Sequence, residues 1–131
     1  MPRMFPGLWL LPVLAALPLQ GPVKAHHTFV TRYDSSKLVT VSGTITSVSF
    51  TNPHIFFDLS GKAKSGGEVT WRIETEGILA ARAKGLTEQV LKAGASVTVT
   101  GWLGRESAAE IGLKSISLQG GRTISMRKSA R

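Results

Sequence analysis

The sequence predicts an all-β domain with a short helical insert, folded as a small five- to six-stranded barrel of the oligonucleotide/oligosaccharide-binding (OB) type. Three observations lead to this prediction. Five segments carry the β-branched or alternating pattern of strands. A change to helical spacing separates the third segment from the fourth, where an OB barrel has its helix. Gly43 interrupts a long first strand, which must bend or bulge to serve both halves of a barrel. A β-sandwich is the alternative fold.

The strands are predicted from β-branched residues and from a period of two. In the third segment, Val69, Trp71 and Ile73 fall on one side and polar residues fall on the other. In the fifth segment, the alternation shifts its phase near Ser115. The predicted strands are Lys37–Val48, His54–Ser60, Glu68–Glu76, Ser96–Leu103 and Ile111–Leu118, and Thr123–Met126 can add a last short strand.

The segment between residues 78 and 92 predicts one or two short helical pieces, split near Gly85. Thr87 is a candidate cap for the second piece, and Gly94 is its candidate end. Residues 26–36 lack a clear period and are predicted to form an irregular N-terminal arm.

The first 25 residues have the features of a signal peptide. Arg3 gives a positively charged start, Phe5 to Leu19 is largely apolar, and Val23-Lys24-Ala25 places small residues where cleavage needs them. We therefore expect a periplasmic or secreted protein that begins at His26, with a retained N-terminal anchor as the alternative. The chain has no cysteine, which excludes a lipoprotein anchor and disulfide bonds. No later stretch is long and apolar enough to span a membrane.

The chain that remains after cleavage is long enough for one domain with a single core. Loss of Arg3 and Lys24 lowers the formal net charge from +8 to +6, and the remaining basic residues are scattered. A basic excess of this size is compatible with nucleic acid, anionic lipid or an acidic partner, but the charges are not gathered into a binding surface. The predicted organisation is a signal peptide (1–25), an N-terminal arm (26–36), a β-barrel domain (37–126) and a basic tail (127–131).

The sequence predicts binding rather than catalysis. It has no nucleophile elbow, cysteine nucleophile or phosphate-binding glycine loop. Glu74 and Glu76 share one strand face, which is more typical of a hydrated edge than of an acid–base pair. We expect no nucleic-acid partner, because the aromatic residues that would stack on bases fall on apolar faces. These residues are Phe56, Phe57, Trp71 and Trp102.

Several short motifs follow one another in a fixed order. They are His26-His27-Thr28-Phe29, Tyr33-Asp34, Val41-Ser42-Gly43-Thr44-Ile45, Thr51-Asn52-Pro53-His54, Trp71-Arg72-Ile73-Glu74 and Val97-Thr98-Val99-Thr100-Gly101. Their order resembles a family of small exported bacterial proteins known only as a domain of unknown function. The resemblance covers the mature chain and implies an exported location and a small β-barrel, but no established activity. Thr28 departs from the usual serine, and the segment after Glu74 departs from the usual Gly/Ser/Pro-rich sequence.

Three histidines form a candidate metal site. A mature N-terminal His26 would offer its amine and its ring nitrogen, and His54 or His27 would complete a three-nitrogen site. Copper(II) heads the divalent affinity order and favours such nitrogen ligands. Zinc is less expected, because the chain lacks cysteine and any typical His/carboxylate spacing. The simpler alternative is that His26 and His27 form a frayed terminus and that His54 merely begins a strand.

A metal-free binding module is the other function that the sequence allows. A small barrel can hold a ligand or a protein partner on its middle strands and loops. The candidate polar contacts are then Tyr33, Asn52, Arg72 and Glu74. The pattern identifies neither the physiological ligand nor the oligomeric state.

Overall fold

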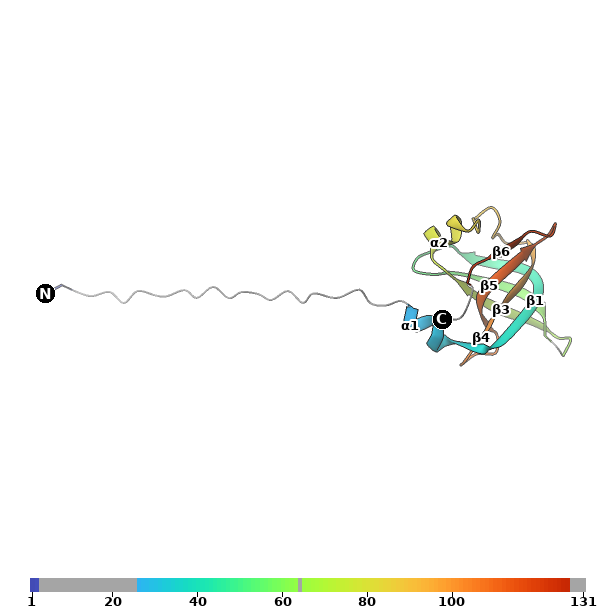
Figure 1. Cartoon of the computed structure of the whole chain (residues 1–131), viewed down its shortest axis with the longest axis horizontal. Coiled ribbons are helices and arrows are strands. Elements are labelled where there is room, and N and C mark those ends of the chain that lie inside the picture. Colours follow the sequence, from blue (N-terminus) through green and yellow to red (C-terminus); the bar gives the residue numbers. More distant parts are fainter. Residues whose placement is uncertain (3–25, 64, 128–131) are drawn as a thin grey trace.

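The computed structural model describes residues 1–2, 26–63 and 65–127, and for residues 26–28 it describes the backbone alone. Two short helices and six strands make up this part of the chain (Figure 1). The predicted signal peptide and most of the predicted basic tail lie outside the described residues. The elements are α1 (His26–Arg32), β1 (Tyr33–Ser49), β2 (Ile55–Lys62), β3 (Glu68–Thr75), α2 (Ile78–Ala83), β4 (Ser96–Gly104), β5 (Glu110–Leu118) and β6 (Thr123–Ser125).

The six strands form one sheet in the order β3-β2-β1-β4-β5-β6. A parallel pairing of β3 with β5, from Arg72 opposite Glu110 to Glu74 opposite Gly112, joins five of the strands into a ring. The predicted class is therefore confirmed: the protein is mostly β, its five-stranded ring closes on itself, and α2 lies between β3 and β4. A sandwich of two separate sheets does not form, because one sheet supplies both walls of the core.

The long strand β1 serves both halves of the ring, as the sequence predicted. Gly43 pairs with Gly61 of β2 on one side and with Val97 of β4 on the other. A Cβ atom at Gly43 would lie 2.1 Å from the carbonyl oxygen of Ser60, so this position allows no side chain. The irregularity in pairing with β2 lies between Ile45 and Ser47, not at Gly43. Gly43 therefore permits a close approach of two strands rather than forming the bulge itself.

The interior of the ring holds the main hydrophobic core. Along β2, Ile55, Phe57 and Leu59 are buried in alternation with partly exposed residues, which is the period of a strand with one face on the core. Leu86 and Leu91 close one end of the core from the segment that follows α2. The phase shift predicted near Ser115 is present, since the pairing of β4 with β5 changes register next to that residue.

Two local predictions are wrong. Residues 26–36 are not irregular: they form α1 and the start of β1. Packing explains the helix, because Phe29 and Tyr33 are four residues apart on one face and both contact neighbouring elements. Residues 87–92 form hydrogen-bonded turns rather than a second helical piece, with the amide of Leu91 donating to the carbonyl of Thr87.

None of the helices in the described ranges has the length and apolar character needed to cross a membrane.

The close approach at Gly43 gives a testable prediction for stability. Gly43→Ala should lower the free energy of unfolding by about 1–3 kcal/mol, because the added methyl group meets backbone atoms that cannot rotate away. The change is measured by urea denaturation. Gly67→Ala is the matched control, since nothing lies within 4 Å of a Cβ atom at that glycine. Equal stability of the two variants would contradict the packing described for β1 and β2.

Candidate functional site

A buried carboxylate, that of Glu74, lies on the outer face of the ring. Strand alternation points the flanking Ile73 and Thr75 into the core and Glu74 outward, yet Glu74 is only 4% exposed. Its cross-strand neighbours are Phe56 of β2 and Gly112 of β5. A Cβ atom at Gly112 would lie 2.4 Å from the ring of Phe29, so the missing side chain makes room for α1. The residues of α1 and the start of β1 therefore cover this part of the sheet.

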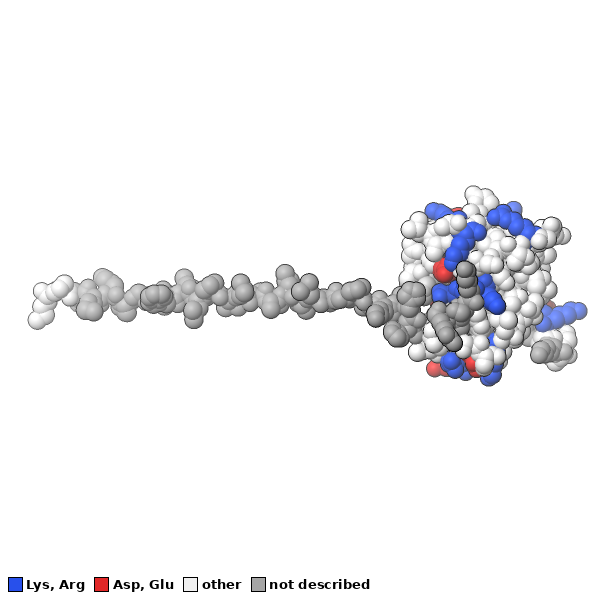
Figure 2. All heavy atoms as spheres, viewed as in Figure 1, with Lys and Arg blue, Asp and Glu red and all other residues white. Residues whose placement is uncertain are grey.

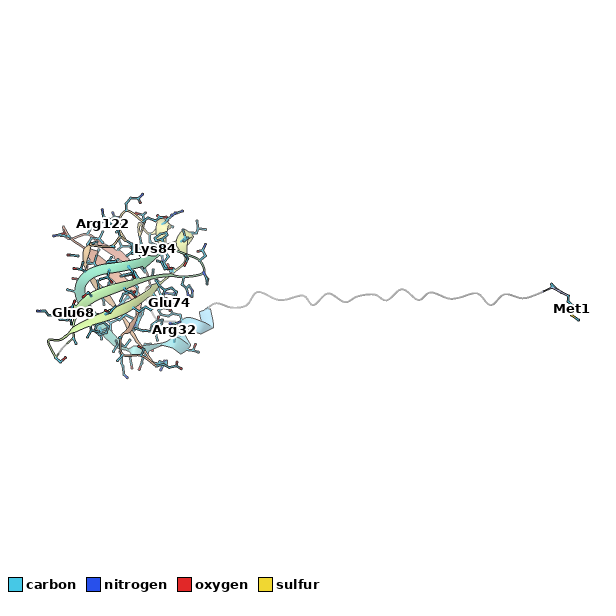
Figure 3. All side chains as sticks on the ribbon, turned by 180° about the vertical axis from the view of Figure 1, so that it is seen from behind. Met1, Arg32, Glu68, Glu74, Lys84 and Arg122 are labelled. Carbon is cyan, nitrogen blue, oxygen red and sulfur yellow. The ribbon has the colours of Figure 1, made fainter. Side chains whose placement is uncertain are left out.

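Three side chains compensate the buried charge of Glu74. The hydroxyl of Tyr33 donates to Oε2 at 2.5 Å, and Nδ1 of His54 lies 2.7 Å from Oε1. The guanidinium of Arg32 lies 3.5 Å from Oε2 and also contacts Glu110 at 3.3 Å. A buried carboxylate requires such donors, because removing it from water without partners costs several kcal/mol. In Figure 3, Arg32 and Glu74 lie next to each other at the end of the domain that bears α1.

Tyr33 is a permanent donor in this network. Burial raises the pKa of its phenol far above the usual value, and the hydrogen bond and negative charge of Glu74 raise it further. The hydroxyl therefore stays protonated throughout the physiological range and holds one oxygen of the carboxylate in place.

Of the two ring nitrogens of His54, Nδ1 contacts Glu74 and Nε2 points away from it. Because a carboxylate accepts hydrogen bonds, Nδ1 carries the proton and Nε2 of a neutral ring keeps its lone pair. Among the described side chains, none bonds to Nε2, and the side chain is 24% exposed. Histidines that bind metals usually have this arrangement, with the second ring nitrogen donating to a carboxylate. His54 is therefore oriented as a potential ligand.

The loop before His54 is hydrogen-bonded to the first residue of α2. The side-chain oxygen of Asn52 accepts the backbone N–H of Ile78 at 3.0 Å, in place of a cap from Gly77. The Asn52–Pro53 peptide bond is cis, and Gly77 approaches the carbonyl of Pro53 closely. Asn52 thus has a structural role beside the site, and its role as a ligand contact stays a prediction.

Arg72 lies beside the network without contacting Glu74. Its guanidinium stacks over the ring of Phe56 at 4.8 Å and lies 3.4 Å from Asp58. Arg32 approaches the same ring at 6.0 Å. Phe56 is therefore flanked by two arginines on the outer face of β2 and β3.

The side chains of His26 and His27 lie outside the described residues, so the predicted copper geometry is not described. The backbone places both residues in the first turn of α1. Within the described side chains, no group of three histidine or carboxylate residues forms a metal cluster.

The structure thus brings together three of the predicted site residues, Tyr33, His54 and Glu74. Sequence reasoning did not identify Arg32, whose role follows from its place at the end of α1. Phe29 anchors α1 on Trp102 and Gly112. The four-residue spacing of Phe29 and Tyr33 was the available signal for this helix.

The basic residues form no single stripe on the face seen in Figure 2, where broad uncharged areas separate them. The fold and this polar network define a small β-rich domain whose fold alone does not fix an activity. The chain matches the model of the family of unknown function DUF6152 over residues 15–115 and belongs to this family. The predicted membership of an uncharacterised family is thereby confirmed, whereas export stays a prediction.

No curated protein matches the chain. A similar solved structure is that of the ZRD-deleted mutant of TiaS in complex with agmatine, with a TM-score of 0.52 and 17% sequence identity. The likeness covers 76% of this chain, which spans only 29% of the TiaS chain. At this identity, it concerns the fold alone.

The Tyr33 hydroxyl gives the second testable prediction. Tyr33 is the only tyrosine in the chain, so ultraviolet absorbance of tyrosinate reports on this one phenol. The native protein should form no tyrosinate as the pH passes about 10, where an ordinary tyrosine ionises. Protein unfolded in guanidinium should titrate there. Above this pH only the unfolded state loses the proton, so the free energy of unfolding falls as the pH rises.

Tyr33→Phe provides the control. It should lack this part of the pH dependence, and near neutral pH it should lower the free energy of unfolding by about 1.5–3 kcal/mol, the contribution of a hydrogen bond to a charged group. A native titration midpoint close to that of unfolded protein would contradict the burial of the phenol.

Proposed function

We propose that the protein is an exported small binding protein that holds copper(II) through the amine and ring of a mature N-terminal His26 and through Nε2 of His54, with His27 assisting. It binds the ion rather than catalysing a reaction. The location follows from the signal-peptide features of residues 1–25, and cleavage after Ala25 creates the free amine that the site requires.

The observation that carries the proposal is the contact of His54 with Glu74. A buried carboxylate fixes the ring, and the nitrogen left over is the one that a metal would use. Glu74 is itself held by Tyr33 and Arg32, so the ring orientation does not depend on one weak contact. A preorganised ligand loses less conformational freedom on binding, which favours affinity.

The position of α1 supports the other half of the site. The helix begins at His26, and its last residue, Arg32, contacts Glu74. At a rise of 1.5 Å per residue, the first turn lies within about 10 Å of Arg32 along the helix axis. Cleavage would therefore place the new amino group on an element that already covers the site.

Copper(II) is favoured over other ions because all the proposed ligands are nitrogen atoms. An α-amine has an ordinary pKa near 8, so its deprotonation near neutral pH costs only about 1 kcal/mol. Imidazole ligands bind metal only in the neutral form, so affinity should fall steeply below about pH 6.

A metal-free module is the second candidate, favoured by Phe56 and its two flanking arginines. A partner could contact the exposed Arg72 and Asn52 directly. Tyr33 and Glu74 are 1% and 4% exposed, so they would position neighbouring side chains rather than touch the partner.

The third testable prediction concerns the copper site. Mature protein that begins at His26, with no added residue, should bind one copper(II) ion and give an electron paramagnetic resonance spectrum with several nitrogen ligands. One extra N-terminal glycine should change the spectrum and weaken binding, because the amine and ring of His26 no longer form one chelate. His54→Ala should remove one nitrogen from the spectrum.

Two controls separate ligand loss from damage to the fold. Glu74→Gln keeps the volume of the side chain and the ring of His54 but removes the carboxylate that orients it, so it should weaken binding less than His54→Ala. The intact mass of the secreted protein tests cleavage after Ala25. If the glycine extension and His54→Ala both leave affinity and spectrum unaltered, the copper proposal is wrong. A protein partner that is lost with Arg72→Ala but not with His26→Ala would favour the metal-free module.

A further inference from the structure

A groove of about 1060 Å³ lies at the end of the ring opposite the Glu74 site. Residues 40–44 of β1 and the start of β4 form its floor, and the hairpin of β2 and β3 and the end of β5 form its rim. Glu68 stands on this rim, at the other end of β3 from Glu74 (Figure 3). The groove therefore shares no residue with the proposed copper site.

Hydroxyl groups dominate the lining of the groove. Seven of its fifteen lining residues are serine or threonine, and only Lys62 and Glu68 are charged. Glu68 accepts a hydrogen bond from Ser60, so its charge is partly engaged. The groove is thus close to neutral on a chain whose formal net charge is +8.

The strand register arranges these hydroxyls in a row. Ser42, Thr98 and Ser117 line the groove and are successive cross-strand partners on β1, β4 and β5, and Thr123 of β6 continues the row outside it. The hydroxyls of Ser42 and Thr98 lie 2.7 Å apart, and those of Ser117 and Thr123 lie 2.8 Å apart. Along this row the hydroxyls are therefore ordered as hydrogen-bonded pairs across neighbouring strands.

A second row runs beside the first. It consists of Thr40, Thr100, Ser115 and Ser125, and the hydroxyls of Thr40 and Thr100 lie 2.9 Å apart. Thr40 lines the groove, and the other three residues continue the row outside it. Each hydroxyl has one donor and two acceptor lone pairs, so a bonded pair keeps one donor and spare acceptors for a ligand. The pairs are already ordered on rigid strands, so a ligand need not immobilise them.

We propose that this groove binds a neutral polysaccharide chain, in contact with the hydroxyls of Ser42, Thr98 and Ser117. Sugar hydroxyls match the protein hydroxyls in size and in their mixture of donors and acceptors, and a neutral chain needs no charged partner. No aromatic side chain is among the described residues that line the groove, so sugar rings gain no stacking. The affinity for a short chain should therefore be low and should increase with chain length.

The test is a titration of the purified protein with chitohexaose, a neutral β-linked oligosaccharide, followed by the backbone amide resonances in nuclear magnetic resonance spectra. Resonances of residues 40–44 and 96–98 should shift with saturation, while those around Glu74 should not. The double substitution Ser42→Ala with Thr98→Val should weaken binding by about five- to tenfold, because two hydroxyls are lost with almost no change in shape. Ser42→Lys, which places a long side chain in the groove, should weaken it further.

The matched control is Ser49→Ala with Thr51→Val, which removes another exposed hydroxyl pair, 3.3 Å apart, outside the groove. It should leave binding unchanged. Amide spectra of every variant must keep the dispersion of the native fold, which separates a lost contact from lost structure. Absence of shifts at millimolar chitohexaose, or equal binding by the groove and control variants, would overturn the proposal. Binding of an anionic polysaccharide alone, abolished by salt, would also overturn it, since net charge would then explain the contact.

Discussion

The structure outside the core depends on the burial of one carboxylate, that of Glu74. Strand alternation would leave this side chain in water. It is covered because Gly112 on the neighbouring strand has no side chain, so the ring of Phe29 can lie against the sheet there. Once covered, the charge must be compensated, and the three groups that do so come from different places along the chain. Arg32 ends α1, Tyr33 begins β1, and His54 leads into β2.

This network makes the docking of α1 and the orientation of His54 parts of one arrangement. A seven-residue helix is too short to be stable alone in water, so α1 needs its tertiary contacts. Phe29 supplies apolar contact with Tyr33 and Trp102, and Arg32 supplies charge. If α1 leaves the sheet, Glu74 regains water and no longer requires His54. The ring core has its own closed set of apolar contacts, so the outer network can loosen without the ring unfolding.

Much of the fold could be predicted from the sequence, because strand patterns depend on local period and side-chain shape. The five main strands followed from β-branched residues and alternation, the insert after the third strand from a change to helical spacing, and the register change at Ser115 from a shift in the alternation. The helix α1 did not, because residues 26–32 include β-branched side chains with modest helix propensity, and its stability comes from Gly112, some eighty residues later. The turn of residues 87–92 has helical spacing but too few residues to sustain a helix.

Individual residues of the candidate site could be predicted from the sequence, but the contacts between them could not. Tyr33, His54 and Glu74 could each be named from residue type and motif, but a sequence pattern carries no distance between them. Arg32 could not be distinguished from other scattered arginines, since its function depends on where a helix ends. The hydroxyl rows were equally hidden, because serine and threonine on the outer positions of strands are ordinary until the register aligns them across four strands.

The two candidate sites differ in how strongly each depends on a single side chain. At the Glu74 site the contacts depend on one another, so substitution of one side chain should disturb the whole network. The hydroxyl groove is neutral, exposed and repeated, so no one side chain dominates it. Glu74 lies six positions after Glu68 along β3, which at about 3.3 Å per residue is roughly 20 Å. Effects at this separation are normally additive. Because the strands between them are rigidly paired, occupancy of one proposed site should leave the affinity of the other unaffected.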